Sequence, residues 1–189
     1  SSDITHLDFG CGKGDLIRLL IEKGCNSVGV ELNEVNRLDL KKMGIKVEQS
    51  INAFSDESFD LITLFHVFEH LIDLDHHIKS WHKKLKKNGL LVIEVPHALD
   101  ALIKKFNLSS FKSYTFWSEH LILWTAPSLI NLFSKLGFDH EKTIKHQRYP
   151  LSNHLHWIFK GKPGGHKLYP ELNKIDVNKT YVEFLSDSN

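Results

Sequence analysis

The sequence predicts an α/β fold, a three-layer α/β/α sandwich built around a mostly parallel sheet. Short apolar runs alternate with helical patterns along most of the chain, and this alternation is typical of a parallel sheet covered on both faces. The first apolar run leads through a glycine-rich turn, residues 10–14, straight into a helical pattern. With 189 residues and 41% hydrophobic content, the chain is large enough to bury the core of one domain.

Each element is predicted from its own local pattern. The helix that begins near residue 73 should end at Asn88-Gly89, because this pair favours the left-handed conformation found just past helix ends. Pro96 ends the next apolar strand, and residues 97–124 are irregular and rich in aromatic side chains. In chain order the expected elements are a strand at 4–9, a helix at 14–23, a strand at 27–31, a helix at 34–42, strands at 45–49 and 59–65, a helix at 73–87, a strand at 90–95, a helix at 126–136 and a strand near 138–146.

The C-terminal part of the chain is harder to place. Residues 153–160 are either the last strand of the sheet, or that strand lies beyond Asn189. A turn-rich stretch follows, and residues 177–185 have a helical pattern. We expect one domain over 1–189, with a core at 4–147 and a C-terminal extension at 148–189, in a chain trimmed at its ends.

The glycine turn has the chemistry of a nucleoside-cofactor site. It follows Asp8, has the spacing Gly10-x-Gly12-x-Gly14 and opens a helix, so it directs backbone N–H groups and a helix N-terminus at a bound anion. The second apolar run ends in Glu31. A carboxylate at that place can accept hydrogen bonds from both hydroxyl groups of a ribose.

The details of the turn indicate which cofactor binds. The dinucleotide fingerprint is G-x-G-x-x-G, but here Asp15 stands where the third glycine belongs. The two charges of a pyrophosphate would be repelled by Asp8. S-adenosylmethionine has no phosphate; its α-carboxylate suits the loop N–H groups and its α-ammonium suits Asp8. A nicotinamide-dependent oxidoreductase is the alternative.

At these residues the chain resembles the class I S-adenosylmethionine-dependent methyltransferases of the small-molecule type (families 11, 12 and 23). Their first motif is an acidic residue followed by G-x-G-x-G. The resemblance implies a Rossmann-like fold, S-adenosyl-L-methionine as cofactor and S-adenosyl-L-homocysteine as product.

A second stretch, residues 58–71, is similar to the fourth motif of the same family. There "S-F-D" introduces the fourth strand and "E-H-L" follows it. Nucleic-acid amino-methyltransferases carry Asp or Asn, then Pro-Pro and an aromatic residue at this place, so Phe65-His66-Val67-Phe68 counts against methylation of a base. The resemblance implies that cofactor contacts come from Asp8, Phe9, Gly10, Cys11, Gly12, Gly14, Glu31, Leu32, Phe65 and His66.

Histidines are frequent in this part of the chain. His66 and His70 are four residues apart and could share a metal if they lay on one helix face. We expect no metal, because the histidines that follow (His76, His77 and His82) lie among lysines and should decorate a solvated helix face.

Residues 117–129 resemble the segment before the fifth helix in many small-molecule methyltransferases. Thr125 is suited to cap that helix, with Pro127 in its first turn. His120 then lies in a loop over the pocket, where it is either a substrate-binding or general-base residue or a buried histidine that holds the loop. The candidate catalytic residues are His120 first, His66 second and His97 third.

A late block, residues 148–166, is similar to bacterial methyltransferases encoded with surface-polysaccharide genes. The alternative is a loop that packs against the sheet edge. The polysaccharide resemblance would make the acceptor a sugar.

The composition narrows the function further. The net charge of +1 gives no electrostatic case for nucleic acid, and no apolar run approaches the roughly 20 residues needed to span a membrane. Two cysteines make no disulfide framework, and the simpler location is a reducing cytoplasm. We expect in-line methyl transfer to a small-molecule acceptor, with oxygen as nucleophile on a sugar or other metabolite. The alternative from another class is a catalytically weak cofactor-binding domain of a larger enzyme; the oligomeric state stays open.

Overall fold

The computed structural model describes residues 4–116, 120–174 and 176–187. Its internal contacts group the chain into two compact units. The first consists of Ser1–Val95 and Ile130–Asp139, and the second of Pro96–Leu129 and His140–Asn189. The expected extent of a single domain over 1–189 stays a prediction.

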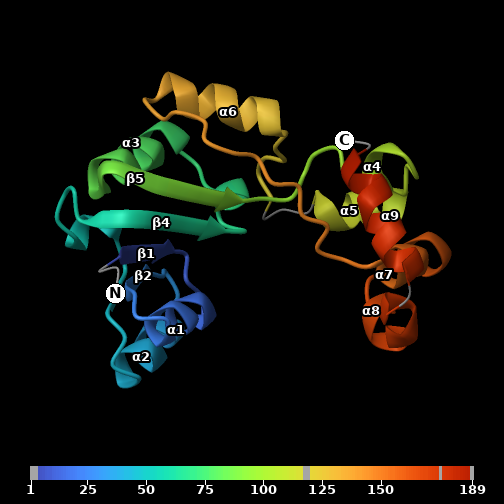
Figure 1. Ribbon diagram of the computed structural model, residues 1–189, viewed down its shortest axis with the longest axis horizontal. Helices are drawn as coiled ribbons and strands as arrows, with labels where there is room; N and C mark the ends of the chain where they lie inside the picture. Colours follow the sequence, from blue (N-terminus) through green and yellow to red (C-terminus); the bar gives the residue numbers. More distant parts are fainter. Residues whose placement is uncertain (1–3, 117–119, 175, 188–189) are drawn as a thin grey trace. The chain divides into compact units, whose positions relative to one another are not determined.

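The first unit is built on a five-stranded sheet in the order β3-β2-β1-β4-β5 (Figure 1). Every pairing between neighbouring strands is parallel, as predicted. The chain moves outward from β1 through β2 to β3 and then returns to the other side of β1 with β4, so a topological switch point lies between β1 and β4. The strands are β1 (Thr5–Phe9), β2 (Asn26–Val30), β3 (Val47–Glu48), β4 (Phe59–Phe65) and β5 (Leu85–Glu94).

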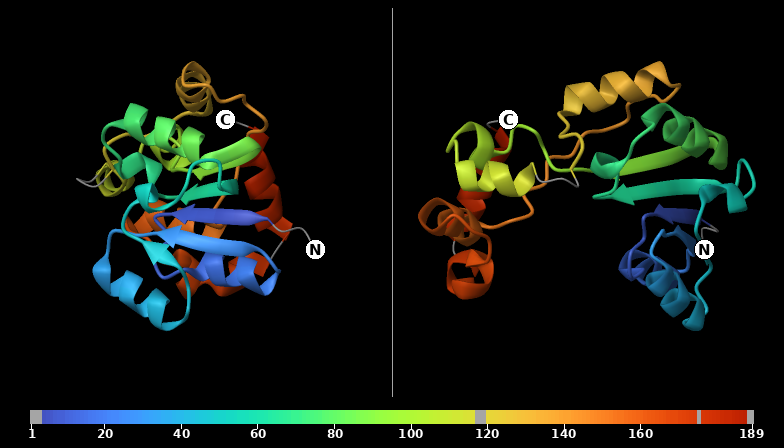
Figure 2. Two further views of the ribbon diagram at one scale, coloured as in Figure 1. Left: turned by 90° about the vertical axis from the view of Figure 1, so that its left-hand side faces the viewer. Right: turned by 180° about the vertical axis from the view of Figure 1, so that it is seen from behind.

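Helices lie on both sides of this sheet (Figures 1 and 2). One side carries α1 (Asp15–Glu22) and α2 (Glu34–Lys42), and the other carries α3 (Leu74–Lys84). Two single turns of 3-10 helix, η1 (Ile51–Ala53) and η2 (Phe68–His70), join the larger elements. The first four strands and the first two helices match their predicted positions to within two residues at each end, and α2 and β4 have the predicted bounds.

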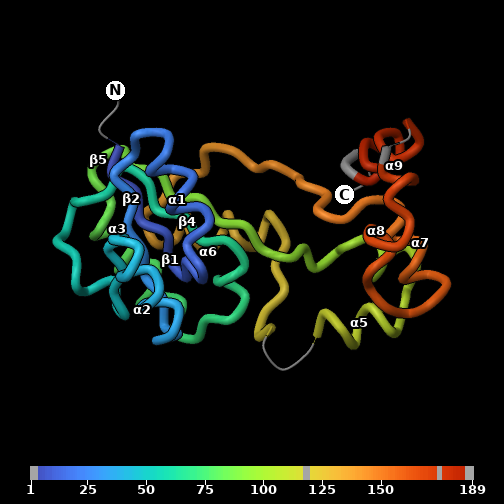
Figure 3. Tube along the Cα trace, turned by 90° about the horizontal axis from the view of Figure 1, so that it is seen from below, coloured from blue at the N-terminus to red at the C-terminus, as the bar shows by residue number. Residues whose placement is uncertain are grey.

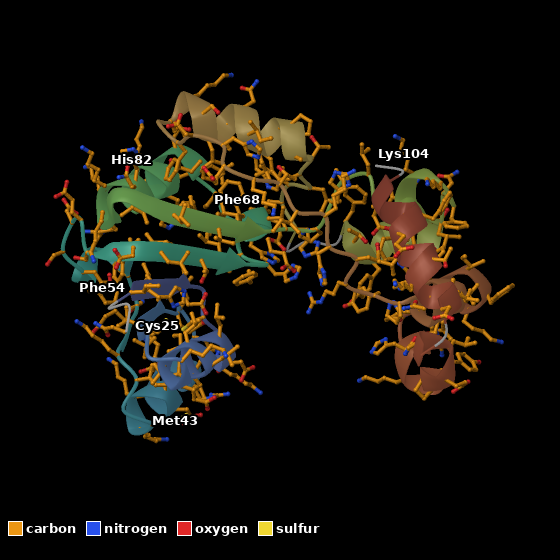
Figure 4. All side chains as sticks on the ribbon, in the orientation of Figure 1. Cys25, Met43, Phe54, Phe68, His82 and Lys104 are labelled. Atoms are coloured by element: carbon orange, nitrogen blue, oxygen red, sulfur yellow. The ribbon has the colours of Figure 1, made fainter. Side chains whose placement is uncertain are left out.

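Alternation along β1 divides its side chains between the two faces. Phe9 packs edge-on against Trp81 of α3, with ring centroids 5.4 Å apart. Trp81 is fully buried and also contacts Phe68, labelled in Figure 4, whose ring packs in turn against Phe133 of α6. On the opposite face a buried cluster joins the glycine turn, α1, α2 and β3; it consists of Cys11, Ile17, Leu40, Ile45 and Val47.

The helix predicted over 73–87 ends earlier than expected, at Lys84. The ammonium group of Lys84 donates to the carbonyl of Phe54 and to a carboxylate oxygen of Asp56, both at 2.7 Å, and it is buried there. Leu85 is already extended and pairs with Phe59 at the start of β4. Asn88-Gly89, expected to stop the helix, lies instead where the register between β4 and β5 shifts. Contacts far apart in the sequence therefore set this helix end.

The second unit is helical among its described residues, and the Cα trace in Figure 3 follows it. Its elements are α4 (Ala101–Lys104), α5 (Ser109–Thr115), the start of α6 (Ala126–Lys135), α7 (Leu151–Lys160), α8 (Gly165–Leu168), η3 (Pro170–Lys174) and α9 (Asp176–Asp187). Helices α7, α8 and α9 contact one another directly or through η3.

Three predictions for the C-terminal part have clear outcomes. The strand near 138–146 is wrong, because residues 138–148 form neither strand nor helix. The strand at 153–160 is also wrong, because these residues belong to α7. The helical pattern at 177–185 is confirmed by α9. None of the helices in the described part of the chain is long and apolar enough to cross a membrane.

Candidate functional site

A hollow of about 400 Å³ opens where β1 and β4 end. This is the carboxyl edge of a parallel sheet beside its switch point, where α/β folds of this kind bind ligands. The volume lies in the range of small-molecule sites, roughly 300–1,000 Å³. The hollow is lined by Asp8, Gly10, Cys11, Gly12, Lys13, Asp15, Leu16 and Phe65.

The glycine turn curls back on its own strand and brings main chain to the edge of the hollow. The N–H groups of Gly10 and Cys11 donate to the carbonyl of Val30, at 2.8 and 3.0 Å. Gly14 has φ +73°, and a Cβ there would come within 2.5 Å of Cδ2 of Leu40, so any other residue would be strained and would displace Leu40. The turn is thereby held between β2 and α2.

The start of α1 faces the hollow through Asp15 and Leu16. No side chain among the residues that the structure describes caps this helix, and its first N–H groups lack carbonyl partners within the helix. Such a helix end favours an anion. The carboxylate of Asp15 is exposed and is paired with Arg18, which offsets its negative charge at this end.

Asp8 is the buried charge of the hollow, with 5% of its surface exposed. Burial raises the pKa of Asp8 to about 6; the hydroxyl of Thr63, which donates to it at 2.8 Å, opposes the rise and the charge of Glu31 adds to it. The side chain is therefore an anion at neutral pH, but one that is costly to keep ionised. A cationic ligand would relieve that cost.

Glu31 is the first residue after β2 and is fixed by two main-chain groups. The N–H of Gly12 donates to Oε2 and the N–H of Asn33 donates to Oε1, both at 2.7 Å. Each carboxylate oxygen can accept a further hydrogen bond, so both remain available to a diol. Leu32, the next residue, is 77% exposed.

Phe65 and His66 occupy the end of β4. Phe65 lines the hollow. His66 follows with a φ of +56°, and its Nε2 lies 3.0 Å from a carboxylate oxygen of Glu94, at the end of β5. Its Nδ1 lies 3.6 Å from Oε1 of Glu69, which is buried. His66 is therefore oriented by carboxylates on two elements of the first unit.

His120 and His97 belong to the second unit. The ring Nδ1 of His120 donates to the carbonyl of Thr115 at 2.7 Å, so in its neutral form the proton-accepting atom is Nε2. Residues 117–119 of the motif around it lie outside the described residues. The hydroxyl oxygen of Thr125 accepts a hydrogen bond from the N–H of Ser128 at 3.3 Å, as expected of a helix cap. Burial lowers the pKa of His97.

The structure thus gathers part of the predicted site around one hollow: Asp8, Gly10, Cys11, Gly12 and Phe65. The ring of Phe9 packs on α3, Gly14 packs on α2, and Glu31 is tied to the turn. Sequence reasoning missed Lys13, Asp15 and Leu16, although all three lie within or just after the glycine turn. Residues 148–166, expected as a binding block or a loop, contain all of α7.

A family model described as a methyltransferase domain matches residues 1–143. The ubiquinone biosynthesis O-methyltransferase of Pelagibacter ubique is 30% identical over 133 residues, which cover 65% of this chain and 51% of that protein. The protein of the same name from Histophilus somni is 27% identical, over 80% of this chain and 60% of its own length. The chain therefore spans about half the length of the curated relatives it matches.

The fold is also similar to that of solved structures. A crystal structure of an S-adenosylmethionine-dependent methyltransferase from Archaeoglobus fulgidus has a TM-score of 0.61 at 21% identity, covering 92% of this chain and 81% of that one. At this identity the likeness concerns the fold, and it confirms the predicted Rossmann-like architecture.

Proposed function

This chain belongs to family 23 of the methyltransferase domains, an S-adenosylmethionine-dependent family, and from this membership we propose that the protein methylates a hydroxyl oxygen of a small molecule. The name of the curated relatives supports oxygen as the acceptor atom. A phenol-type or a sugar hydroxyl would both satisfy this chemistry.

The observation that carries the proposed cofactor site is the pairing of charges at one hollow. Asp8 offers a buried anion, and the uncapped start of α1 offers N–H groups nearby. The amino-acid end of S-adenosylmethionine carries one ammonium and one carboxylate, which match these two features. A pyrophosphate would bring two negative charges toward Asp8, so the hollow disfavours the nicotinamide alternative.

The other predicted residues take roles around this arrangement. Glu31 would accept hydrogen bonds from the two ribose hydroxyl groups, Leu32 and Cys11 would hold the adenosine, and Phe65 would cover the methionine end. When bound, S-adenosylmethionine supplies a methyl carbon that is electrophilic because it is attached to a sulfonium. Alignment of the acceptor behind that carbon accounts for most of the rate.

An alcohol must lose its proton as it attacks, so a histidine within reach would assist the reaction as general base. We assign this role first to His120, whose Nε2 is its accepting atom, and second to His66, which Glu94 orients.

For the location of the protein we propose a reducing cytoplasm, which suits the two free cysteine thiols.

Binding is tested by calorimetry with S-adenosylhomocysteine. Glu31→Ala should weaken binding roughly 10- to 100-fold, since each hydrogen bond to a charged group contributes about 1.5–3 kcal/mol. Glu34→Ala is the matched control, because Glu34 is exposed on α2 three residues further along. Equal affinities of the two variants, or no heat with the wild-type protein, would contradict the proposed cofactor site.

Catalysis is tested with methyl-labelled S-adenosylmethionine and a panel of catechols, hydroxylated quinols, sugars and amines, using the full-length protein. His120→Ala should lower turnover roughly 10²- to 10⁴-fold and leave S-adenosylhomocysteine affinity unchanged. A fully active His120→Ala protein would move the assignment to His66. Methyl transfer to amines alone would overturn the choice of oxygen.

A further inference from the structure

A line of three buried polar side chains leads to Asp8 through the middle of the sheet. Ser27 Oγ lies 2.6 Å from His6 Nδ1, His6 Nε2 lies 2.9 Å from Thr63 Oγ1, and Thr63 donates to Asp8 at 2.8 Å. His6 has no exposed surface, and Thr63 and Ser27 have 4% and 5%. We call Ser27, His6 and Thr63 the buried polar chain.

The strand register explains why these residues meet. His6 and Asp8 are two apart on β1 and so share a face. In the parallel pairings, His6 stands opposite Ser27 of β2 and Asp8 stands opposite Thr63 of β4. The inner strands of a parallel sheet are normally apolar throughout, so four polar side chains at this place call for an explanation.

The donors and acceptors available fix the direction of the hydrogen bonds along the buried polar chain. The hydroxyl proton of Thr63 goes to Asp8, because an ionised carboxylate only accepts. His6 must then donate to Thr63 from Nε2, which leaves Nδ1 to accept from the hydroxyl of Ser27. This requires a neutral imidazole, and burial does lower the pKa of His6 to about 4. Every donor in the chain therefore points toward the carboxylate.

We propose that the buried polar chain holds the Asp8 carboxylate oriented and ionised for a ligand ammonium group, so that Ser27, His6 and Thr63 are positioning residues for the amino-acid end of the cofactor. The proposal rests on the proposed function and deepens it. Thr63 occupies one carboxylate oxygen from within the sheet, while Asp8 also lines the hollow. His6 prevents the Thr63 hydroxyl from turning away.

The test compares two ligands that share an adenosine. S-adenosylhomocysteine carries the α-ammonium and α-carboxylate groups, and 5′-methylthioadenosine lacks both. Thr63→Val keeps the shape of the side chain and removes the donor. It should lower the affinity for S-adenosylhomocysteine roughly tenfold or more and change that for 5′-methylthioadenosine less than twofold, whereas Thr63→Ser should restore wild-type affinity for both.

The pH profile of binding is a second readout. Asp8 shares its surroundings with Glu31 beyond β2, with Cys11, Lys13 and Asp15 of the turn and α1, and with neutral His6. Burial raises the pKa of the Cys11 thiol to about 12, so Cys11 stays neutral. Affinity for S-adenosylhomocysteine should fall as the pH drops through about 6, where Asp8 takes up a proton. In Thr63→Val the midpoint should move to higher pH, because the lost donor had favoured the anion.

The outcomes separate this inference from the proposed function. If the wild-type protein binds neither ligand, both proposals fail. If it binds both and Thr63→Val weakens both equally, or only lowers the melting temperature, the buried polar chain is merely structural and this inference is overturned while the proposed function stands. If Thr63→Val does not fold, Ser27→Ala replaces it; a loss confined to S-adenosylhomocysteine supports the inference, and an unchanged ratio between the two ligands contradicts it.

Discussion

Both units of the molecule bury histidines, but the hydrogen bonds of these histidines end in different places. In the first unit, the line from His6 ends at Asp8, which lines a hollow. In the second unit, His154 bonds to Tyr181 at 2.8 Å and His156 donates to the carbonyl of Lys162 at 2.7 Å. These last bonds join α7 to α9 and to the turn before α8. Burial of a histidine therefore does not by itself distinguish the two units; the group at the end of its hydrogen bonds does, since only the line from His6 ends at a residue that lines a hollow.

The interior of the second unit is polar over most of one helix face. Asn153, His154 and His156 of α7 are at most 6% exposed. Oδ1 of Asn153 accepts from the N–H of Gly164 at 2.9 Å and from His166 at 3.2 Å. Each of these groups finds its partner inside the same unit, so we expect them to contribute stability and conformational specificity.

The largest effect is expected from Asp8→Asn. Asparagine keeps the shape and still accepts from Thr63, but it carries no charge to pair with a ligand ammonium. Affinity for S-adenosylhomocysteine should fall roughly 10- to 100-fold at pH 7.5, since a hydrogen bond to a charged group contributes about 1.5–3 kcal/mol. Calorimetry measures this loss. An unchanged affinity would show that the hydrogen-bonded line in the first unit is as structural as the one in the second.

The same substitution should stabilise the protein at neutral pH. The pKa of Asp8 is raised from 3.8 to about 6 in the fold, so its ionisation opposes folding by up to about 3 kcal/mol above pH 6 and by nothing below pH 3.8. The titration of His6 affects stability in the opposite direction. Folding lowers the pKa of His6 from 6.5 to about 4, so the free energy of unfolding decreases as the pH drops below 6.5. In the wild-type protein the pH dependences of stability due to Asp8 and His6 offset each other.

In Asp8→Asn only the pH dependence of stability due to His6 remains. The free energy of unfolding from urea titrations should then match that of the wild type near pH 4, exceed it increasingly up to about pH 6 and stay above it by a constant amount at higher pH. A variant less stable than wild type at pH 7.5 would contradict the burial cost assigned to Asp8.

A pair of histidine variants sharpens the comparison between the units. His6→Leu and His154→Leu should each cost about 1–3 kcal/mol of stability, because the first leaves buried partners and the second half-buried partners without their hydrogen bonds. The partners are Thr63 and Ser27 in one unit, and Tyr181 and Gln147 in the other. Only His6→Leu should also weaken S-adenosylhomocysteine binding. Equal binding losses in both variants would remove the distinction drawn here.

The same difference between the units decides how much the sequence could predict. In the first unit short apolar runs form the strands, so these runs locate β1, β2 and β4, and the glycine turn locates the hollow. In the second unit α7 buries serine, asparagine and histidine, which pattern reasoning places at the surface, and so the pattern indicates a strand where the structure has a helix. These buried side chains of α7 have hydrogen-bond partners that lie 11 to 27 residues away in the sequence, namely Asn173, Tyr181 and the N–H of Gly164. A local pattern therefore gives no sign of them.

The candidate site divides in a similar way. Asp8, Gly10, Gly12 and Phe65 follow strand ends and a local motif, so their positions could be predicted. The buried polar chain could have been found too, because polar residues at positions 6, 27 and 63 interrupt three strands of a parallel sheet. The carboxylates around His66 could not, since Glu94 reaches it only through the pairing of β4 with β5.

The smallest expected effect concerns two glycines with left-handed backbone, one in each unit. Gly12 has φ +53°, and a Cβ added to it would have no neighbour within 4 Å; Gly161 has φ +64°, and a Cβ there would meet only Ser110, at 3.4 Å. Alanine at either position should therefore cost about 1 kcal/mol of stability. This is the strain of the left-handed conformation, reduced by the gain that comes from the lower entropy of the unfolded chain with alanine.

The two variants should differ in binding. Gly12 lines the hollow, so its added methyl group also takes up space that a ligand would use. Gly12→Ala should lose roughly tenfold in S-adenosylhomocysteine affinity, about 1.4 kcal/mol. Gly161 follows the last residue of α7, and Gly161→Ala should bind as tightly as wild type. Thermal unfolding and calorimetry on the pair separate strain, which both share, from occupancy of the hollow, which only Gly12 can affect; equal affinities would place the ligand away from the glycine turn.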